Sequence, residues 1–457
     1  MTSASSVISL RGMKVKKEQE VVQRQRWPRS LFSAPSIVLF LLCVLYFSAY
    51  VDRVNISTTA SLMRHEFGIS NAEMGLVFSA FSYPYVLFMV FGGWLADRFG
   101  ARRVLIACVT VAAVATFATS MVTGLVGLFA CRLLLGFGES VMFPSATRGM
   151  QAWIPQDRYG FVQGITHSFS RLGNAVTPPI VAALVILWGW RGSFAAMGVL
   201  TVLWVFFWAY YYRDDPRDHP KIVPEDLVDL PERAPAKARR VPWRRLAWRM
   251  APVTFTYFCY GWSAWVYLNW LPSFFLDGHG FDLKKSAAFA SGVFFAGVVG
   301  DTVGGLMSDA IKRRTGNVKL ARLSVLWVGM LGSAACLTAM MFLEDVMIIT
   351  MVLAAGFFFL ELVIAPAWAV PMDIAPQYGG TASAMMNIGF ALAGILSSVT
   401  FGLILDLTGS WYLPFLCSIG LLLAGTATSL AMHPERQFID EPSGPVKTGT
   451  LRIVSTQ

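Results

Sequence analysis

Long runs without any charged residue constrain this chain more than any other feature. A helix needs about 20 apolar residues to cross a bilayer, and the uncharged runs 192–212, 323–343 and 411–432 all reach that length. They are continuously apolar and do not alternate over about 10 residues, as the strands of a membrane barrel do. Only 14% of the residues are charged and the mean hydropathy is +0.56, against about 25% charged residues in soluble domains. We therefore predict an all-α integral membrane protein.

Charge, cysteines and the start of the chain argue against other classes of protein. The formal net charge is +10, but the positive residues fall in loops, so we expect no nucleic acid partner. The six cysteines lie far apart inside apolar runs, which fits neither a disulfide framework nor a zinc site. The first thirty residues are polar and basic, without the apolar core of a signal peptide. No phosphate-binding glycine loop and no nucleophile–base cluster is recognisable, so we expect no cofactor, no metal and no enzymatic activity.

Twelve transmembrane helices are predicted from the apolar segments. They cover residues 34–60, 71–96, 103–122, 124–148, 159–187, 191–212, 250–275, 286–309, 320–343, 345–370, 380–406 and 412–432. Basic clusters lie in alternate loops, which by the positive-inside rule places both termini in the cytoplasm. The predicted order is a cytoplasmic tail (1–33), a six-helix half (34–212), a cytoplasmic linker (213–249), a second six-helix half (250–432) and a cytoplasmic tail (433–457).

Two internal repeats support the division into halves. The segment "GGWLADRFGARR" (92–103) ends the second predicted helix, and "GGLMSDAIKRR" (304–314) ends the eighth. The segments "ESVMFP" (139–144) and "ELVIAP" (361–366), in helices four and ten, share Glu, Val and Pro in register. Duplicated six-helix halves with these loop signatures resemble the major facilitator superfamily. The resemblance implies a substrate site between the halves near mid-membrane and alternating access by rocking of the halves.

The repeated loop segment is called the loop motif below. Its members are Gly93, Asp97, Arg98, Arg102 and Arg103, with Gly305 and Asp309 in the second half. Glycine permits close approach of helices, an acid suits a helix N-terminus or a loop arginine, and the arginines suit anionic lipid headgroups. Either the motif only signals topology or, as the resemblance implies, it is a gating latch.

Charged residues inside a membrane are expensive and indicate function. Arg132 and Glu139 are seven residues apart, which places them within about 20° of one helix face and about 10 Å apart along the axis. A guanidinium binds a carboxylate in a bidentate manner, so competition between Glu139 and a substrate for Arg132 would link protons to an anion. The alternative is a buried ion network that fixes helix packing.

Four further charged or titratable residues leave alternatives open. Arg171 is either a second anion-binding group or the resting partner of Glu139. His167 fits a packed histidine better than a proton relay. Glu361 lacks an arginine at the position that corresponds to Arg132, which favours packing or gating over proton transfer. Asp301 lies two turns before the loop motif, which favours a structural role in that motif.

Within the superfamily, "YVDRVNIS" (50–57), "RLLLGFGESVMFPS" (132–145) and "DDPRDHP" (214–220) resemble the anion:cation symporters that import sugar acids and aromatic acids. By that resemblance Asp52 and Glu139 would carry protons, and Arg53 and Arg132 would meet the substrate carboxylate. Tyr85, Trp368 and Asn387 would line the pocket. The run "HSFSRLGN" (167–174) departs from the family, because sugar-acid members commonly carry an amide there. With the aromatic run 257–270, this leaves room for a less hydroxylated substrate.

The sequence predicts a monomeric, proton-coupled importer of a small organic anion in a bacterial-type inner membrane, in contact with membrane lipids. Asp52 and Arg53 are neighbours on a helix and point about 100° apart, so we expect Asp52 to take its own proton while Arg53 joins Arg132. A proton-antiporting exporter of drugs or metabolites is one alternative, although "LGNAVTPPIVAAL" (172–184) lacks the Gly-Pro pattern of such proteins. An uncoupled anion exchanger or uniporter is the other, although it would not require the two acids.

Overall fold

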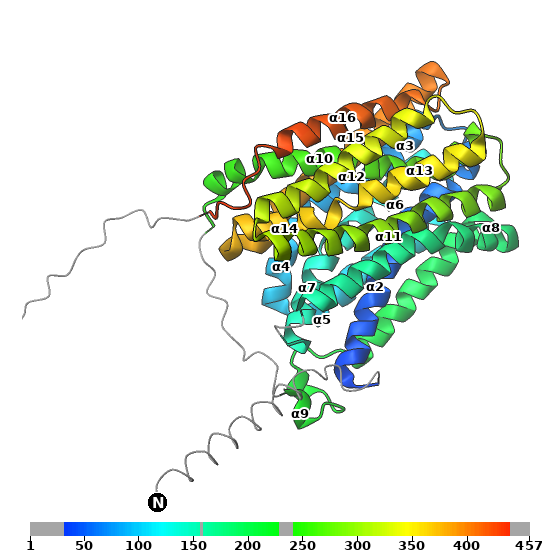
Figure 1. Cartoon of the computed structure of the whole chain (residues 1–457). Coiled ribbons are helices and arrows are strands. Elements are labelled where there is room, and N and C mark those ends of the chain that lie inside the picture. The colour runs from blue at the N-terminus through cyan, green and yellow to red at the C-terminus, as the bar shows by residue number, and fades with distance from the viewer. Residues whose placement is uncertain (1–31, 156–158, 228–240, 439–457) are drawn as a thin grey trace, which may run out of the picture.

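The computed structural model describes residues 32–155, 159–227 and 241–438. Most of both expected tails (residues 1–31 and 439–457) and residues 228–240 of the predicted linker therefore lie outside the described residues. Within the described residues nine helices are long and apolar enough to cross a membrane. One of them, α8, turns at Gly189, and α10 and α16 complete twelve spans. The helices lie side by side in one elongated bundle (Figure 1).

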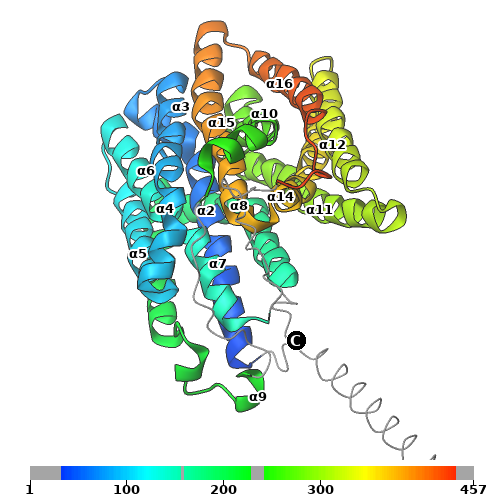
Figure 2. The same cartoon turned by 90° about the vertical axis from the view of Figure 1, so that its left-hand side faces the viewer.

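The helices fall into an N-terminal and a C-terminal set. The first set is α2 (Ala34–Phe67), α3 (Asn71–Ala80), α4 (Ser82–Phe99), α5 (Ala101–Thr119), α6 (Leu125–Ser140), α7 (Met142–Trp153) and α8 (Tyr159–Tyr211). The second is α10 (Trp243–Ser273), α11 (Leu283–Thr315), α12 (Val318–Met340), α13 (Val346–Glu361), α14 (Ile364–Ile374), α15 (Gly379–Thr408) and α16 (Leu413–Ser429). Short helices η2 (Pro216–Asp218), α9 (Pro224–Leu227), η3 (Phe274–Gly278) and η4 (Pro376–Tyr378) connect them. In Figure 2, α2–α7 lie on one side and α11, α12, α14 and α16 on the other.

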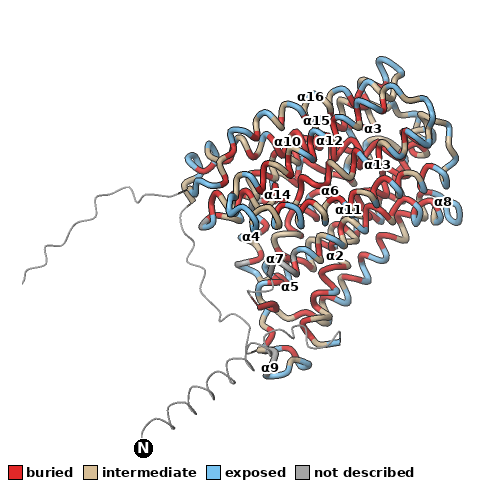
Figure 3. Tube along the Cα trace, in the orientation of Figure 1, coloured by how far each residue is buried: buried red, intermediate tan, exposed pale blue. Residues whose placement is uncertain are grey.

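Several bounds differ from the expected ones. The first helix runs to Phe67 rather than to residue 60, because a left-handed Gly68 ends it only there and bonds back to the Arg64 carbonyl. The fifth and sixth spans, which together carry the label α8, meet at the non-helical Gly189 with φ 70°, in agreement with the expected gap between residues 187 and 191. The predicted linker contains η2 and α9, and α10 begins at Trp243, seven residues before the expected start. Buried residues concentrate along the inner sides of the bundle (Figure 3).

Proline explains why three spans are each broken into two helices. Pro84, Pro144 and Pro366 each occupy the third position of the second helix, α4, α7 and α14. A proline has no N–H to donate to the carbonyl four residues earlier, and its ring clashes with that carbonyl. The breaks, at Val141 and at residues 362–363, therefore lie within two residues of the repeat-related Glu139 and Glu361.

The two halves are joined firmly at the end where α2 stops and α3 begins. Gly402 on α15 packs so closely on α3 that an added Cβ would lie 2.2 Å from the Asn71 carbonyl oxygen. The Asp406 carboxylate accepts hydrogen bonds from the backbone N–H groups of Asn71 and Ala72, at 3.1 and 2.6 Å. Asp277, between α10 and α11, lies 3.3 Å from Arg64. The molecule is thus closed at this end, which we call the closed end.

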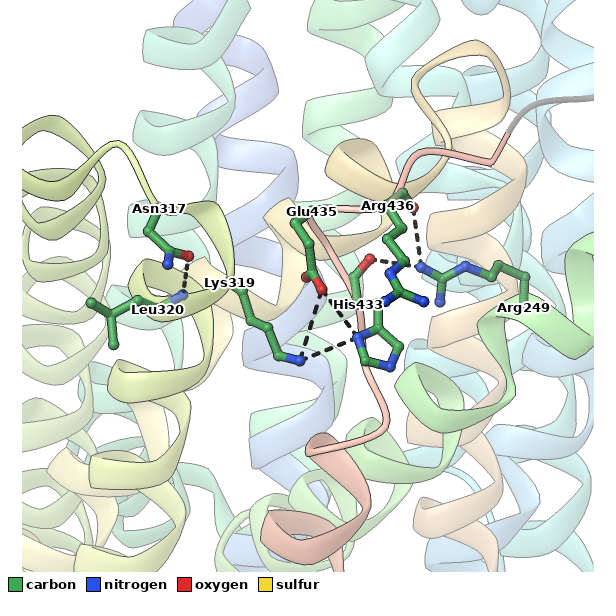
Figure 4. Close-up of polar contacts among 7 residues, drawn as sticks. All are labelled: Arg249, Asn317, Lys319, Leu320, His433, Glu435 and Arg436. Atoms are coloured by element: carbon green, nitrogen blue, oxygen red, sulfur yellow. Dashed lines mark hydrogen bonds and ion pairs between the residues drawn. The ribbon is translucent and has the colours of Figure 1, made fainter.

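At the opposite end, where the basic loops lie, the chain after α16 crosses the C-terminal half (Figure 4). Arg249 of α10 donates to the carbonyls of His433 and Arg436, at 2.7 and 3.1 Å. Lys319 of α12 lies 3.8 Å from the Glu435 carboxylate. This segment, residues 433–438, therefore ties α10 to α12.

Candidate functional site

A buried ion pair lies at the centre of the N-terminal half. Arg53 Nε donates to Glu139 Oε2 at 2.9 Å, and Arg53 Nη2 lies 2.8 Å from the same oxygen. The side chains are 5% and 0% exposed. The second carboxylate oxygen, Oε1, has no hydrogen-bond partner among the described residues. Glu139 therefore has its ion pair with Arg53, and not with Arg171, which was one of the two expectations for Arg171.

Aromatic rings enclose the Arg53 guanidinium. Its carbon lies 4.8 Å from the centre of the Tyr50 ring, 4.9 Å from Phe81, 5.3 Å from Tyr85 and 5.6 Å from Phe143. The faces of aromatic rings carry negative potential and attract a cation. The rings thus stabilise the charged guanidinium in an apolar interior without using its N–H groups, which bond with the Glu139 carboxylate.

Arg132 is buried without a counter-ion within hydrogen-bonding range. It is 3% exposed, and its Nε and Nη2 atoms have no hydrogen-bond partner in the part of the chain that the structure describes. Its guanidinium carbon lies 5.1 Å from the Phe81 ring, which Arg53 contacts as well. Buried donors without partners are rare in proteins and cost free energy. This guanidinium is therefore the side chain in the site most open to an added anion.

Asp52 is a further buried charge near this group. It is 4% exposed, and its Oδ1 atom has no hydrogen-bond partner within the described ranges. Its charge is within electrostatic reach of Glu139, Arg132 and Arg53, and no ion pair joins it to Arg53 among the described residues. This agrees with the expectation that the two neighbours face different groups.

A second cluster of charges bridges the two halves. Arg171 of α8 lies 3.4 Å from Glu361 at the end of α13 and 3.5 Å from Asp301 of α11. The Tyr260 hydroxyl donates to Glu361 at 3.3 Å. The partner that Glu361 lacks on its own helix is thus supplied by the opposite half. Asp301 faces this cluster rather than the loop motif, because its α11 turn packs against α8.

The remaining expected pocket residues are Tyr85, Trp368 and Asn387. Trp368 donates to the Tyr257 hydroxyl at 2.9 Å, and its ring centre is 6.1 Å from that of His167. Asn387 donates to the Met89 sulfur at 3.1 Å. Tyr85 stacks on Phe81. Trp368 and Asn387 therefore contact the N-terminal half from the C-terminal half.

Part of the loop motif is described. Arg98 lies over the rings of Trp94 and Phe99. The Arg102 guanidinium donates to the Ala209 carbonyl and its backbone N–H to the Asp214 carboxylate. Arg103 is exposed. The side chain of Asp97, and the surroundings of Gly93, lie outside the described residues.

In the second copy of the motif, Asp309 is largely exposed and lies 3.5 Å from Arg322. Gly305 faces Ala365 of α14, and a Cβ added at Gly305 would lie 3.3 Å from the Ala365 Cβ. Arg322 donates to the Ser308 hydroxyl at 2.8 Å and to the Asp373 carboxylate at 2.9 Å. Sequence reasoning missed Arg322 because it counted this residue only as part of a basic loop cluster, whereas the structure buries it.

Sequence reasoning also missed the rings of Tyr50, Phe81 and Phe143, and the Tyr260 hydroxyl. The signal for Tyr260 was present, because it lies within the aromatic run 257–270. The other three rings carry no sequence signal, since aromatic residues are common throughout these apolar helices.

Twelve spans in two sets, with charged groups buried inside and between the sets, define a membrane transporter rather than an enzyme. The chain matches the family model of the Major Facilitator Superfamily over residues 42–398. It belongs to this superfamily, and within it to the anion:cation symporter family. The resemblance read from the sequence is thereby confirmed, as is the expected fold.

Several curated relatives are similar over most of their length. A probable sulfoacetate transporter of Cupriavidus necator is 46% identical over 421 residues, 91% of this chain and 97% of the relative. The hexuronate transporter of Bacillus subtilis is 27% identical over 86% and 93% of the two chains. A probable galactarate/D-glucarate transporter of Escherichia coli is 29% identical over 82% and 88%.

Solved structures agree on the fold. A bacterial homolog of the human lysosomal transporter Spinster, in an inward-facing and unoccupied conformation, superposes with a TM-score of 0.75 at 15% identity. The match covers 90% of this chain and 100% of that one.

Proposed function

We propose that this protein takes up a small organic anion in symport with protons, by alternating access across a bacterial plasma membrane. The observation that carries the proposal is Arg132, a buried side chain near the Arg53–Glu139 pair whose Nε and Nη2 atoms have no hydrogen-bond partner among the described residues. The names of the relatives, which include transporters of sulfoacetate, hexuronate and glucarate, support an organic acid as substrate.

Proton coupling follows from the charges around Arg132. Arg53 neutralises Glu139, so an anion that binds Arg132 and draws on Arg53 leaves the Glu139 carboxylate without a partner. A buried carboxylate without a cation favours its protonated form, and the free Oε1 atom of Glu139 is available to accept the proton. Asp52 is the second proposed proton carrier. Tyr85, Trp368 and Asn387 are proposed to line the substrate.

The first test uses the purified full chain in proteoliposomes with an inward proton gradient. We expect the gradient to drive accumulation of a labelled organic acid from a panel of sulfonated, sugar and dicarboxylic acids, and an uncoupler to abolish it. If the uptake of every acid is unaffected by the gradient and by the uncoupler, the uncoupled exchanger is favoured instead. Uptake driven by a proton gradient of the opposite direction would favour an antiporter.

A substitution assigns the coupling residue. Glu139→Gln keeps the shape of the side chain but cannot bind or release a proton, so gradient-driven accumulation should fall to the level of empty vesicles. Counterflow exchange of labelled for unlabelled anion requires no net proton movement and should be partly kept. Glu344→Gln, on an exposed loop, is the matched control and should accumulate substrate like the unmodified protein. Persistent accumulation by Glu139→Gln would remove this residue from the coupling mechanism.

A further inference from the structure

The cluster of Arg171, Asp301 and Glu361 carries more negative than positive charge. It holds one guanidinium and two carboxylates, at 3.4 and 3.5 Å, and the side chain of Glu361 is 1% exposed. Isolated charges are costly in an apolar interior. The cluster is electrically balanced when one of the two acids holds a proton.

The contacts in this cluster are looser than those in the N-terminal half. The Arg171 contacts exceed 3.3 Å, whereas Arg53 and Glu139 approach to 2.8 and 2.9 Å. Arg171 Nε and Glu361 Oε2 have no hydrogen-bond partner among the described residues. A charge-assisted hydrogen bond normally has a distance of about 2.7–2.9 Å. Arg171 is therefore held by its acids more weakly than a committed structural pair would be.

Arg171 also lies close to the main group of charges. Its guanidinium carbon is 5.7 Å from the centre of the Tyr50 ring, and that of Arg53 is 4.8 Å from the same centre. The Tyr50 ring therefore contacts both arginines and links this cluster to the Arg53–Glu139 pair. The other groups that face the cluster are His167, Tyr257 and Tyr260, and Tyr260 already donates to Glu361.

The location of the cluster ties it to the transport cycle. Arg171 belongs to the N-terminal half, and Glu361 and Asp301 belong to the C-terminal half. Arg53 and Glu139 both belong to one half, so their pair survives a rocking motion of the halves. The Arg171 contacts cross the moving interface and must break or re-form when the halves change their relative position.

We propose that Arg171 is a second anion subsite, which binds a second acid group of the substrate in exchange for Glu361. When that acid group reaches Arg171, the Glu361 carboxylate loses its counter-ion and takes up a proton, so charge stays balanced. The substrate is then a small dianion with two acid groups, and each dianion brings in a proton at Glu361 in addition to that at the main site. This inference rests on the proposed function and specifies its substrate class.

The experiment compares dianions with monoanions of the same shape. Binding to the purified full chain is measured for sulfoacetate, malonate and succinate, and for derivatives in which an uncharged carboxamide replaces one carboxylate. We expect the unmodified protein to bind its best dianion about ten times more tightly than the matched monoamide, since each such factor corresponds to one added charge-assisted contact. Arg171→Gln should lose this preference while its affinity for the monoamide stays the same.

Proton uptake on binding separates Glu361 from Arg171. In weakly buffered solution with a pH indicator, the unmodified protein should take up more protons with the dianion than with the monoamide. Glu361→Gln should keep the preference for the dianion and lose the extra proton. Arg244→Gln and Glu344→Gln, both exposed, are the controls and should behave like the unmodified protein.

Three outcomes would overturn the inference. In the first, the unmodified protein binds the dianion and the monoamide with equal affinity. In the second, Arg171→Gln keeps the full preference for the dianion, or it loses affinity for both ligands equally. In the third, Glu361→Gln still takes up the extra proton. The first can occur while gradient-driven uptake persists, in which case the transport function stands and only the dianion subsite fails. Conversely, if the protein prefers the dianion but shows no gradient-driven uptake, the proposal of proton-coupled transport fails and the anion subsite at Arg171 stands.

Discussion

At the scale of single residues, the site combines two kinds of arginine. Arg53 is committed to Glu139 and enclosed by rings, whereas Arg132 has N–H groups without partners in the described chain. Both lie near the Phe81 ring. The ion pair holds the Arg53 charge in the apolar interior, and in our proposal the Arg132 guanidinium supplies the directional bonds to the acid group of the substrate.

Arg132→Lys tests that distinction. Lysine keeps the charge but replaces the planar fork by a point charge that cannot bind an acid group through two parallel bonds. A charge-assisted hydrogen bond contributes about 1.5–3 kcal/mol, so we expect substrate affinity to fall by about 10- to 100-fold. The substrate affinity is measured by calorimetry, and Arg244→Lys, at an exposed position, is the control. Unchanged affinity in Arg132→Lys would show that only the charge at this position matters.

At the scale of helices, backbone chemistry positions the charged residues. Pro144 and Pro366 break two repeat-related spans within two residues of Glu139 and Glu361. Each break leaves backbone carbonyls without their helical hydrogen bonds and changes the direction of the span close to its acid. At the closed end, by contrast, the absence of a side chain on Gly402 allows α15 to touch the α3 backbone.

Gly402→Ala should destabilise the closed end. The added Cβ would lie 2.2 Å from a backbone oxygen that cannot rotate away, and overpacking typically costs about 1–3 kcal/mol. Gly420→Ala, on α16 where nothing lies within 4 Å of the added carbon, should be neutral or stabilising because alanine is the better helix former. The thermal unfolding midpoint in detergent should therefore be clearly lower for Gly402→Ala than for Gly420→Ala. Equal midpoints would mean that α3 and α15 are not held in this close contact.

At the scale of the whole molecule, the halves meet through contacts of two kinds. Asp406 caps the N-terminus of α3 and Asp277 pairs with Arg64 at the closed end. Arg171, Trp368 and Asn387 make the contacts deeper in the bundle. Opening at the closed end requires the first kind to break, whereas the second kind belongs to the proposed site of substrate and protons.

Asp406→Asn should shift the molecule toward opening at the closed end. The neutral amide keeps the shape but loses the negative charge that favours the positive end of α3 and accepts fewer backbone N–H bonds. Spin labels at the exposed Leu76 and Leu407, in a variant without the native cysteines, should report a larger population of long distances. Asp309→Asn at the opposite end is the control and should leave the distances at the closed end unchanged. A distribution identical to that of the unmodified pair would rule out this carboxylate as a latch.

The sequence determined the class of protein because its signals are local. Uncharged runs of membrane length, basic loops on alternate sides, and two repeated segments predict a helical membrane protein in two halves, and they lead to the correct family. They also identify the buried charges that lie inside apolar runs, such as Asp52, Arg132 and Glu139, but not Arg322, which lies in a basic cluster. The end of the first helix was less predictable, because the single left-handed Gly68 decides it.

Only the tertiary structure decided which charges meet. Spacing on one helix linked Arg132 with Glu139, but the direct partner of Glu139 is Arg53 from another helix. Glu361 and Asp301 receive Arg171 from the opposite half. The physical reason is that an ion pair forms over about 3 Å between side chains that helix packing brings together, and sequence periodicity describes the faces of one helix at a time.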